Sequence, residues 1–299
     1  MKPNSFPCAA IGLLLAGVAQ VAGQVGAPVE EESAVPKILM VTQEQIKEGR
    51  EAAHIRAEEA WPRIFLKGNV TIHYIGMTSA SGPSAAWFLE PYDSFGAMEK
   101  MRAEVMRSLA GDLETANVQD GELRTGSQTL LTVFRGDLSY RASEAVTSMA
   151  KCRYMGVTVL RIRNGRDADL AQLARLLIDG DQKSNSDQAV LTYQVVSGGP
   201  SGTYLIFEPM ESLARMDAVP ARMAASRQAM GDRAQKHFDM LAPEVIESTE
   251  NLLFAFEPRM SYISKEFAAG DPEFWNPKPA ARGKSAAKPA GAIRTGQNR

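Results

Sequence analysis

Histidines are the side chains whose charge changes most readily near neutral pH, and this 299-residue chain contains three of them. His54 falls on the apolar face of an expected helix, and His73 falls on an expected strand, on the same face as Thr71. An imidazole that faces a cavity can remove a proton from an acidic C–H or O–H group. We therefore predict His54 and His73 as candidate catalytic residues, and the sequence leaves open whether the chain is an enzyme.

A structural interpretation of the same histidines stands beside the catalytic one. His54 could be a partly exposed side chain that pairs with Glu58 one turn later, and His73 could be a half-buried side chain whose hydrogen bonds are satisfied. If the two histidines do face a cavity, its wall would include polar side chains of two expected strands and one aromatic ring. The predicted ligand-binding residues are Thr71, Trp87, Thr192 and Gln194.

The sequence lacks the motifs that usually hold metals and common cofactors. No Cys-x-x-Cys or His-x-x-x-His spacing occurs, so we expect no metal site. There is also no G-x-S-x-G nucleophile motif, phosphate-binding glycine loop or dinucleotide fingerprint, and no cofactor is predicted. Cys152 is expected to be a buried thiol, because a reactive cysteine needs a partner that lowers its pKa.

The beginning of the chain has the composition of a signal peptide, expected at residues 1–23. Lys2 precedes an apolar run from Ala9 to Val21, and cleavage is expected after Gly23. This pattern predicts a periplasmic or secreted protein. No later segment is long and apolar enough to predict a transmembrane span, and residues 24–36 are expected to form a flexible leader.

Charge is distributed unevenly between the end of the chain and the rest. Residues 269–299 are expected to form a disordered basic tail, which has six basic and no acidic side chains from Pro277 onward. Without these and Lys2, the chain has 26 basic and 35 acidic residues, a net charge of about −9. An acidic body lacks the clustered Lys and Arg that bind phosphates, so we expect no nucleic-acid partner.

Three sequence blocks recur in the same order, which predicts an internal duplication. Residues 46–52 recur as 162–168, at an offset of 116 residues. The Gly-Pro-Ser and Glu-Pro pattern of residues 82–91 recurs at 199–209, at an offset of 117 to 118. The Leu-Leu, Phe and Ser-Tyr pattern of residues 130–140 recurs at 252–262, at an offset of 122. We place repeat 1 at residues 37–147 and repeat 2 at residues 153–268.

Each repeat predicts the element order β-α-β-β-α-β. The expected strands include 38–46, 70–77 and 130–134 in repeat 1, and 157–162, 189–196 and 252–256 in repeat 2, with one further strand in each repeat that ends at Glu90-Pro91 or Glu208-Pro209. This order is typical of a split βαβ sheet with helices on one face. The expected fold class is α+β, with two tandem ferredoxin-like units.

This element order and repeat pattern resemble the dimeric α/β-barrel superfamily, which includes antibiotic-biosynthesis monooxygenase-like and NIPSNAP-like domains, over about residues 37–268. The resemblance implies an intrachain pseudo-dimer, hence a monomer with pseudo-two-fold symmetry, and a cavity shared between its two sheets. Some members bind haem. The haem-associated pattern Gly-x-x-Asp-Gly fails here at Asn117, and no His has a diagnostic spacing, so the resemblance leaves haem open without predicting it.

Two classes of function fit these observations. The first is an exported small-molecule-binding barrel protein, and cofactor-independent members of the superfamily suggest that it could be an enzyme. The alternative is a non-catalytic interaction or scaffold protein of the cell envelope, which would use its Met-rich helices to dock a partner.

Overall fold

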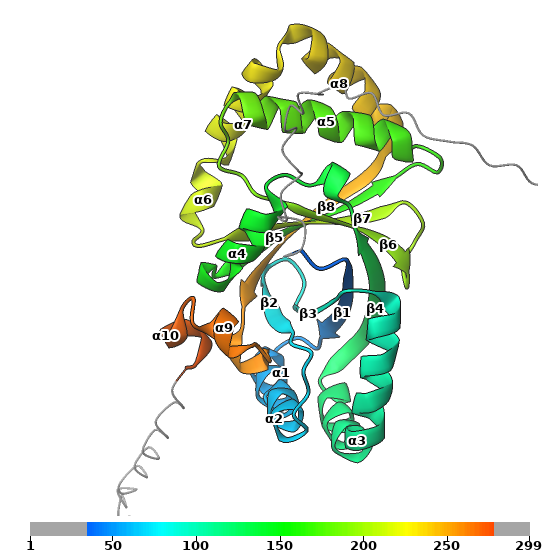
Figure 1. Cartoon of the computed structure of the whole chain (residues 1–299), viewed down its shortest axis with the longest axis vertical. Coiled ribbons are helices and arrows are strands. Elements are labelled where there is room, and N and C mark those ends of the chain that lie inside the picture. Colours follow the sequence, from blue (N-terminus) through cyan, green and yellow to red (C-terminus); the bar gives the residue numbers. More distant parts are fainter. Residues whose placement is uncertain (1–34, 278–299) are drawn as a thin grey trace, which may run out of the picture.

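The computed structural model describes residues 35–277, in which eight strands form one closed barrel with helices outside it (Figure 1). The first half of the chain contains β1 (Ile38–Ile46), α1 (Glu51–Glu58), α2 (Ala60–Lys67), β2 (Ile75–Ser81), β3 (Ala85–Tyr92), α3 (Phe95–Gly121) and β4 (Arg124–Phe134). The second half contains β5 (Tyr154–Ile162), α5 (Asp167–Lys183), β6 (Leu191–Ser197), β7 (Thr203–Met210), α6 (Ala214–Asp217), α7 (Val219–Met230), α8 (Asp232–Val245) and β8 (Ile246–Phe256). The remaining helices are α4 (Ala142–Ser148) between the halves, and α9 (Lys265–Ala268) and α10 (Pro272–Trp275) after them.

The strands follow one another around the barrel in the order β1-β3-β2-β8-β5-β7-β6-β4, and every pair is antiparallel. The two halves meet at two seams. Met77 of β2 lies opposite Phe256 of β8, and Val133 of β4 lies opposite Gln194 of β6. Closure pairs both edges of each half, so the barrel has no open sheet edge.

Apolar side chains from both halves fill the barrel interior. Those of the first half include Leu39, Val41, Met77, Trp87 and Leu89, and those of the second half include Val157, Tyr193, Leu205, Phe207 and Phe254. The cavity expected between the two sheets is therefore small. An eight-stranded barrel holds little besides its own side chains, and a space of about 240 Å³ lies among them, lined by residues such as Leu39, Met155 and Phe207.

Helices cover the outer face of the barrel on two opposite sides (Figure 1). Helices α1, α2 and α3 lie on the first half, and α5, α7 and α8 lie on the second. The turns before α1 and α5 each contain a glycine with positive φ, Gly49 at 73° and Gly165 at 77°, as the repeated Gly predicts. The α3 helix begins where the Ser94 hydroxyl accepts a hydrogen bond from the Ala97 amide at 3.1 Å.

Several strand boundaries differ from those expected. The strand predicted at 70–77 begins only at Ile75, and the one predicted at 189–196 begins at Leu191. Both β3 and β7 continue one residue past the Glu-Pro pairs that were expected to end them, to Tyr92 and Met210. Proline lacks only the N–H donor, so it interrupts the hydrogen bonding on one side of a strand and leaves the extended backbone intact.

The folded body extends into the expected basic tail. Residues 269–277 pack against the barrel, where the Trp275 ring contacts Phe256 and its Nε1 donates to the Ala150 carbonyl at 2.6 Å. The tail boundary at 269 is therefore too early, because the aromatic side chains after it outweigh the Pro and Gly signal. The predicted signal peptide, nearly all of the predicted leader and the rest of the tail lie outside the described residues.

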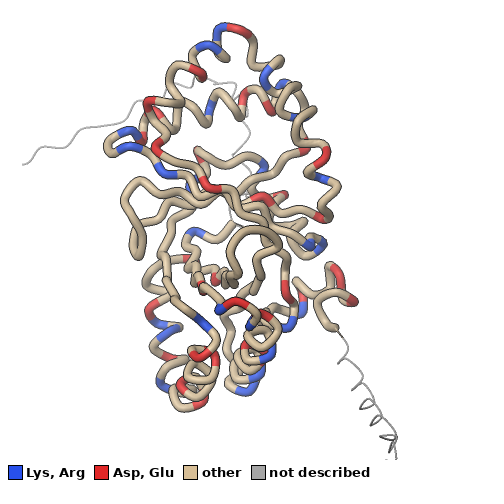
Figure 2. Tube along the Cα trace, turned by 180° about the vertical axis from the view of Figure 1, so that it is seen from behind, with Lys and Arg blue, Asp and Glu red and all other residues tan. Residues whose placement is uncertain are grey.

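Charged residues of both signs are interspersed along the helices at both ends of the long axis (Figure 2). Within residues 35–277, none of the helices combines the length and the apolar character that a bilayer span requires.

Candidate functional site

A cavity of about 630 Å³ lies between the outer face of the first half's strands and helices α1, α2 and α3. Its floor is formed by buried side chains such as Phe65, Tyr74 and Phe88, and exposed residues such as Ala110 and Asn117 form its rim. The volume lies within the range of small-molecule sites. The other lining residues are Met40, Thr42, Glu44, Glu58, Trp61, Ile72, Glu90, Tyr92, Met101, Arg102, Val105, Met106, Leu113, Glu114, Arg124, Ser127 and Thr129.

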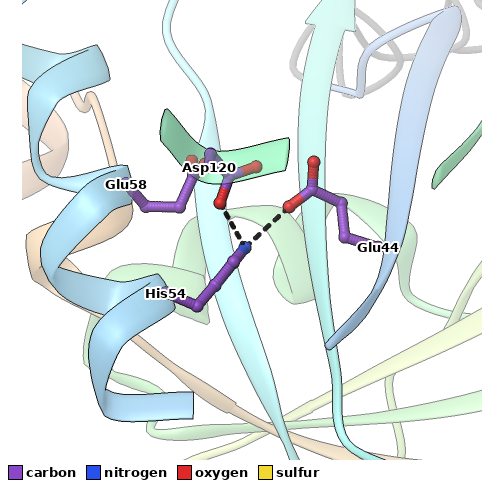
Figure 3. A group of neighbouring side chains, drawn as sticks. All are labelled: Glu44, His54, Glu58 and Asp120. Carbon is purple, nitrogen blue, oxygen red and sulfur yellow. Dashed lines mark hydrogen bonds and ion pairs between the residues drawn. The ribbon is translucent and has the colours of Figure 1, made fainter. Parts of the chain in front are cut away.

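Four buried ionisable side chains meet at one end of this cavity (Figure 3). Glu44 comes from β1, His54 and Glu58 come from successive turns of α1, and Asp120 comes from the end of α3. Nε2 of His54 lies 2.8 Å from Oε2 of Glu44 and 3.1 Å from Oδ1 of Asp120. Each of the four residues is at most 4% exposed, so three separate elements bring an imidazole and three carboxyl groups together away from water.

Arg124, the first residue of β4, holds the outer side of this group. Its guanidinium pairs with Oε1 of Glu44, and its Nε lies 2.8 Å from Oδ2 of Asp120. It also donates to the Asn117 side-chain oxygen at 2.9 Å. Arg124 therefore takes one oxygen from each of two carboxylates and leaves their other oxygens facing His54.

Two carboxyl groups of this cluster, those of Glu58 and Asp120, have raised pKa values. Burial raises the pKa of Glu58 well above its usual value, and the neighbouring charges of Asp120 and Glu44 raise it further. Burial, followed by the charge of Glu44, also raises the pKa of Asp120. Glu90, elsewhere in the cavity, has its pKa raised by burial and accepts a hydrogen bond from the Tyr92 hydroxyl at 3.0 Å.

Two buried donors line the cavity without an acceptor among the described residues. They are the indole Nε1 of Trp61 and the hydroxyl of Tyr74. Buried polar groups in folded proteins nearly always have a hydrogen-bond partner, and exceptions tend to mark sites where water or a ligand binds. These donors therefore make the cavity suited to a molecule that carries hydrogen-bond acceptors.

The structure separates the two predicted catalytic histidines. His54 is 1% exposed and belongs to the buried cluster, so the idea of a partly exposed His paired only with Glu58 is wrong. His73 lies before β2, at the 240 Å³ space at one end of the barrel, where its ring stacks on Tyr262 with the ring centroids 5.0 Å apart. Burial lowers the pKa of His73. The two histidines therefore do not share a site.

The predicted ligand-binding residues do not form one wall either. Thr71 is exposed near Met101, and Trp87 packs inside the barrel against Phe254. Thr192 is buried on the outer face of β6, where its hydroxyl donates to the Leu138 carbonyl at 2.8 Å, and Gln194 accepts from Arg135 at 2.9 Å.

The prediction for β6 assigned its side chains to the wrong sides of the strand. Thr192 and Gln194 were predicted to line a cavity between the sheets, but the residue between them, Tyr193, is the one that points into the barrel. A shift of one residue moves every side chain of a strand to the other face.

Three members of the charged cluster, Glu44, Asp120 and Arg124, were missed from the sequence. A signal was present: at an offset of 116, Glu44 and Glu58 align with Leu160 and Ala174, just as His54 aligns with Leu170. A polar residue in one half whose aligned residue in the other half is apolar marks a position where the fold alone does not require a polar side chain.

The described histidines do not fit a His-ligated haem. None of the three lines the 630 Å³ cavity, and the Nε2 atom of His54 is already held by two carboxylates. His73 borders a space of only about 240 Å³, smaller than ordinary ligand sites.

No protein-family profile and no curated protein matches this sequence. Among solved structures, a candidate monooxygenase from Lactobacillus acidophilus is 12% identical, with 74% of this chain and 94% of that chain covered and a TM-score of 0.44. A candidate monooxygenase from Fusobacterium nucleatum is 11% identical, with coverage of 74% and 93% and a TM-score of 0.48. A mutant chlorite dismutase from Candidatus Nitrospira defluvii is 10% identical, with coverage of 78% and 96% and a TM-score of 0.45.

Proposed function

We propose that this protein binds a small, mainly apolar molecule with hydrogen-bond acceptors in the 630 Å³ cavity of its first half. The observation that carries the proposal is the pair of buried donors, Trp61 Nε1 and Tyr74 hydroxyl, which line the cavity without a protein acceptor. Each such group costs about 1–3 kcal/mol when it is left without a partner. A bound carbonyl or ether oxygen would recover part of that cost.

The rest of the lining sets the shape and polarity of this molecule. Aromatic and thioether side chains such as Phe65, Phe88 and Met101 suit a flat apolar body. The pKa values of Glu58 and Glu90 are raised, so these side chains repel an anionic ligand less than two fully ionised carboxylates would. A neutral aromatic ketone combines the features that this lining favours.

The proposal is tested with 9-fluorenone, a flat aromatic ketone, and with fluorene, which lacks the carbonyl. Binding to the full chain is measured by quenching of tryptophan fluorescence. We expect fluorenone to bind more tightly than fluorene, and Tyr74→Phe to weaken fluorenone binding by roughly 2- to 12-fold, which is one net hydrogen bond. Fluorene binding should be the same in the variant.

A second variant tests the location of the site. Val105 lies on α3 and lines the cavity, so Val105→Trp should fill it and abolish fluorenone binding while circular dichroism shows an intact fold. Equal binding of both probes by the folded wild-type chain, or fluorenone binding that survives Val105→Trp, would contradict the proposal.

We further propose that the barrel consists of two tandem ferredoxin-like units of common origin and is complete in one chain. The pairing of β1 with β4 shifts register at Gln45/Ile46, the pairing of β5 with β8 shifts at Arg161/Ile162, and β1 and β5 each precede a glycine with positive φ. A light-scattering mass equal to one chain would support this, and a dimer would contradict it.

We also propose that the chain is exported after cleavage of residues 1–23, as its N-terminal composition predicts. N-terminal sequencing of the protein from an expressing bacterium tests this: a chain that begins at Gln24 in the periplasm or medium supports export, and an uncleaved chain in the cytoplasm contradicts it.

A further inference from the structure

The buried cluster of Glu44, His54, Glu58 and Asp120 has the composition of a metal site. One ligand atom from each residue lies within 4.8 Å of all the others. Imidazole nitrogen together with carboxylate oxygen suits first-row transition metal ions. The His54 and Glu58 spacing of four residues places both side chains on one face of α1, so a single helix supplies two of the four groups.

The distances in the cluster match those between ligands of one ion. Ligand atoms about 2.1 Å from a metal are roughly 3.0 Å apart at 90° and roughly 3.4 Å apart in a tetrahedron. Nε2 of His54 lies 2.8 Å from Oε2 of Glu44 and 3.1 Å from Oδ1 of Asp120. These two oxygens and the imidazole nitrogen therefore already lie close to the spacing that coordination requires.

Asp120 supplies a separate indication that something else binds here. Its side chain is 1% exposed, and neither of its oxygens makes a hydrogen bond of acceptable geometry with the described residues, although Nε2 of His54 and Nε of Arg124 lie within 3.1 Å. A buried polar atom without a well-formed hydrogen bond often marks the place of a bound water or ion. Direct coordination to a metal ion would satisfy it.

Arg124 contacts the proposed metal ligands without being a ligand itself. It binds the second oxygens of Glu44 and Asp120 and so orients both carboxylates toward the same point, as groups around metal ligands commonly do. Three carboxyl groups and only one guanidinium meet here, and a divalent cation, which displaces protons from its ligands when it binds, would balance the carboxylates that form.

The fold does not require charge at this place. The strand register makes Leu160 of β5 equivalent to Glu44 of β1, and Ile246 of β8 equivalent to Arg124 of β4. Leu170 follows Arg166 by one helical turn as His54 follows Arg50. In the second half these positions belong to an apolar core, so the cluster is not needed to build the barrel.

We propose that Glu44, His54, Glu58 and Asp120 bind one divalent transition metal ion at the wall of the 630 Å³ cavity. Glu44 and Glu58 line the cavity itself, so the ion would face the molecule that the cavity holds. Metal binding at this site does not depend on the organic ligand proposed above.

The test uses the full chain, stripped with a chelator and titrated with Mn²⁺, whose free form is followed by electron paramagnetic resonance. We expect one Mn²⁺ per chain and its displacement by Zn²⁺, which binds nitrogen and oxygen ligands more tightly. Glu58→Gln, which keeps the size of the side chain, should weaken Mn²⁺ binding at least ~10-fold. Glu90→Gln is the matched control in the same cavity and should bind as the wild type does.

The outcomes separate this proposal from that of the organic ligand. Val105→Trp should lose fluorenone and keep Mn²⁺, and Glu58→Gln should lose most Mn²⁺ affinity. A folded wild-type chain that binds neither Mn²⁺ nor Zn²⁺ would overturn the metal site, whatever the fluorenone result. Mn²⁺ binding that is equal in the wild type and Glu58→Gln would also overturn it.

Discussion

The two halves of the barrel use the same strand register but differ in what lies between the strands and the helices. In the first half, Ala86 lies beside Glu44 on the neighbouring strand, and the charged cluster and the cavity occupy the space. In the second half, Tyr204 lies beside Leu160 and is fully buried. The small side chain of Ala86 leaves space for the charged cluster and the cavity, whereas the large side chain of Tyr204 fills the equivalent space and becomes part of the core.

The helix layers differ in the same sense. In the second half, α5 and α7 approach closely because Gly180 has no side chain, and a Cβ there would lie 2.8 Å from the Ser226 carbonyl oxygen. In the first half, Trp61 and Phe65 on α2 and Val105 on α3 face the cavity from both sides. The helix layer of the second half is therefore closely packed, whereas the helix layer of the first half encloses a cavity.

Exchanging the cluster for the residues of the second half should have the largest effect. The variant carries Glu44→Leu, His54→Leu, Glu58→Ala, Asp120→Ala and Arg124→Ile together. We expect Mn²⁺ binding to be abolished, while the free energy of unfolding stays unchanged or rises by about 1–4 kcal/mol, because buried charges are costly to desolvate. Urea unfolding and the Mn²⁺ titration measure both. Loss of the fold would show that the two halves are not interchangeable here.

Removing Arg124 alone should destabilise the chain by about 3–5 kcal/mol, since it leaves the buried carboxylates of Glu44 and Asp120 without their cation. The measurement is urea unfolding of Arg124→Ala. The control is Arg166→Ala in the second half, whose pair with Asp169 is about one-third exposed and should contribute less than about 1 kcal/mol. Equal losses of unfolding free energy in Arg124→Ala and Arg166→Ala would contradict the interpretation that Arg124 stabilises buried carboxylates.

A glycine-to-alanine pair compares the two helix layers directly. Gly180→Ala should destabilise the second half by about 1–3 kcal/mol, because the new Cβ would collide with Ser226. Gly111→Ala on α3 meets no atom within 4 Å and should stabilise the first half by about 0.4–1 kcal/mol. Thermal unfolding of both variants tests the contrast, which fails if the two changes have the same sign.

The smallest expected effect concerns the residue that fills the second half. The Tyr204 hydroxyl donates to Oδ1 of Asp167 at 2.6 Å, so Tyr204→Phe should cost about 0.5–1.5 kcal/mol at neutral pH. Burial, followed by the hydrogen bond to Asp167, raises the pKa of Tyr204 to about 12.

The same pKa shift predicts a difference at high pH. A phenol with a pKa of about 12 when folded and 10 when unfolded ionises first in the unfolded chain, so its contribution is complete below pH 10 and is lost between pH 10 and 12. Urea unfolding across this range should show wild-type stability falling more steeply than that of Tyr204→Phe. Parallel curves would contradict a raised pKa at Tyr204.

The sequence by itself predicted the order of strands and helices, because its signals are local or repeated, and the barrel was implied by the resemblance that this order carries. The run at 38–46 is β1 as observed, and the repeated glycines at 49 and 165 have the positive φ that their turns require. The comparison of His54 with Leu170 also singled out one true member of the charged cluster. That comparison works because the aligned position in the second half is apolar, so the core of the fold does not need a titratable ring there.

Only the tertiary structure decided where the cavity lies and which groups meet in it. Glu44 and Asp120 are 76 residues apart in the sequence, and no local pattern places the end of α3 beside β1. The face of β6 depends on where the strand begins, which alternation alone does not fix, so Thr192 and Gln194 were placed on the wrong side. Local periodicity determines elements, whereas burial and long-range pairing determine which side chains share a site.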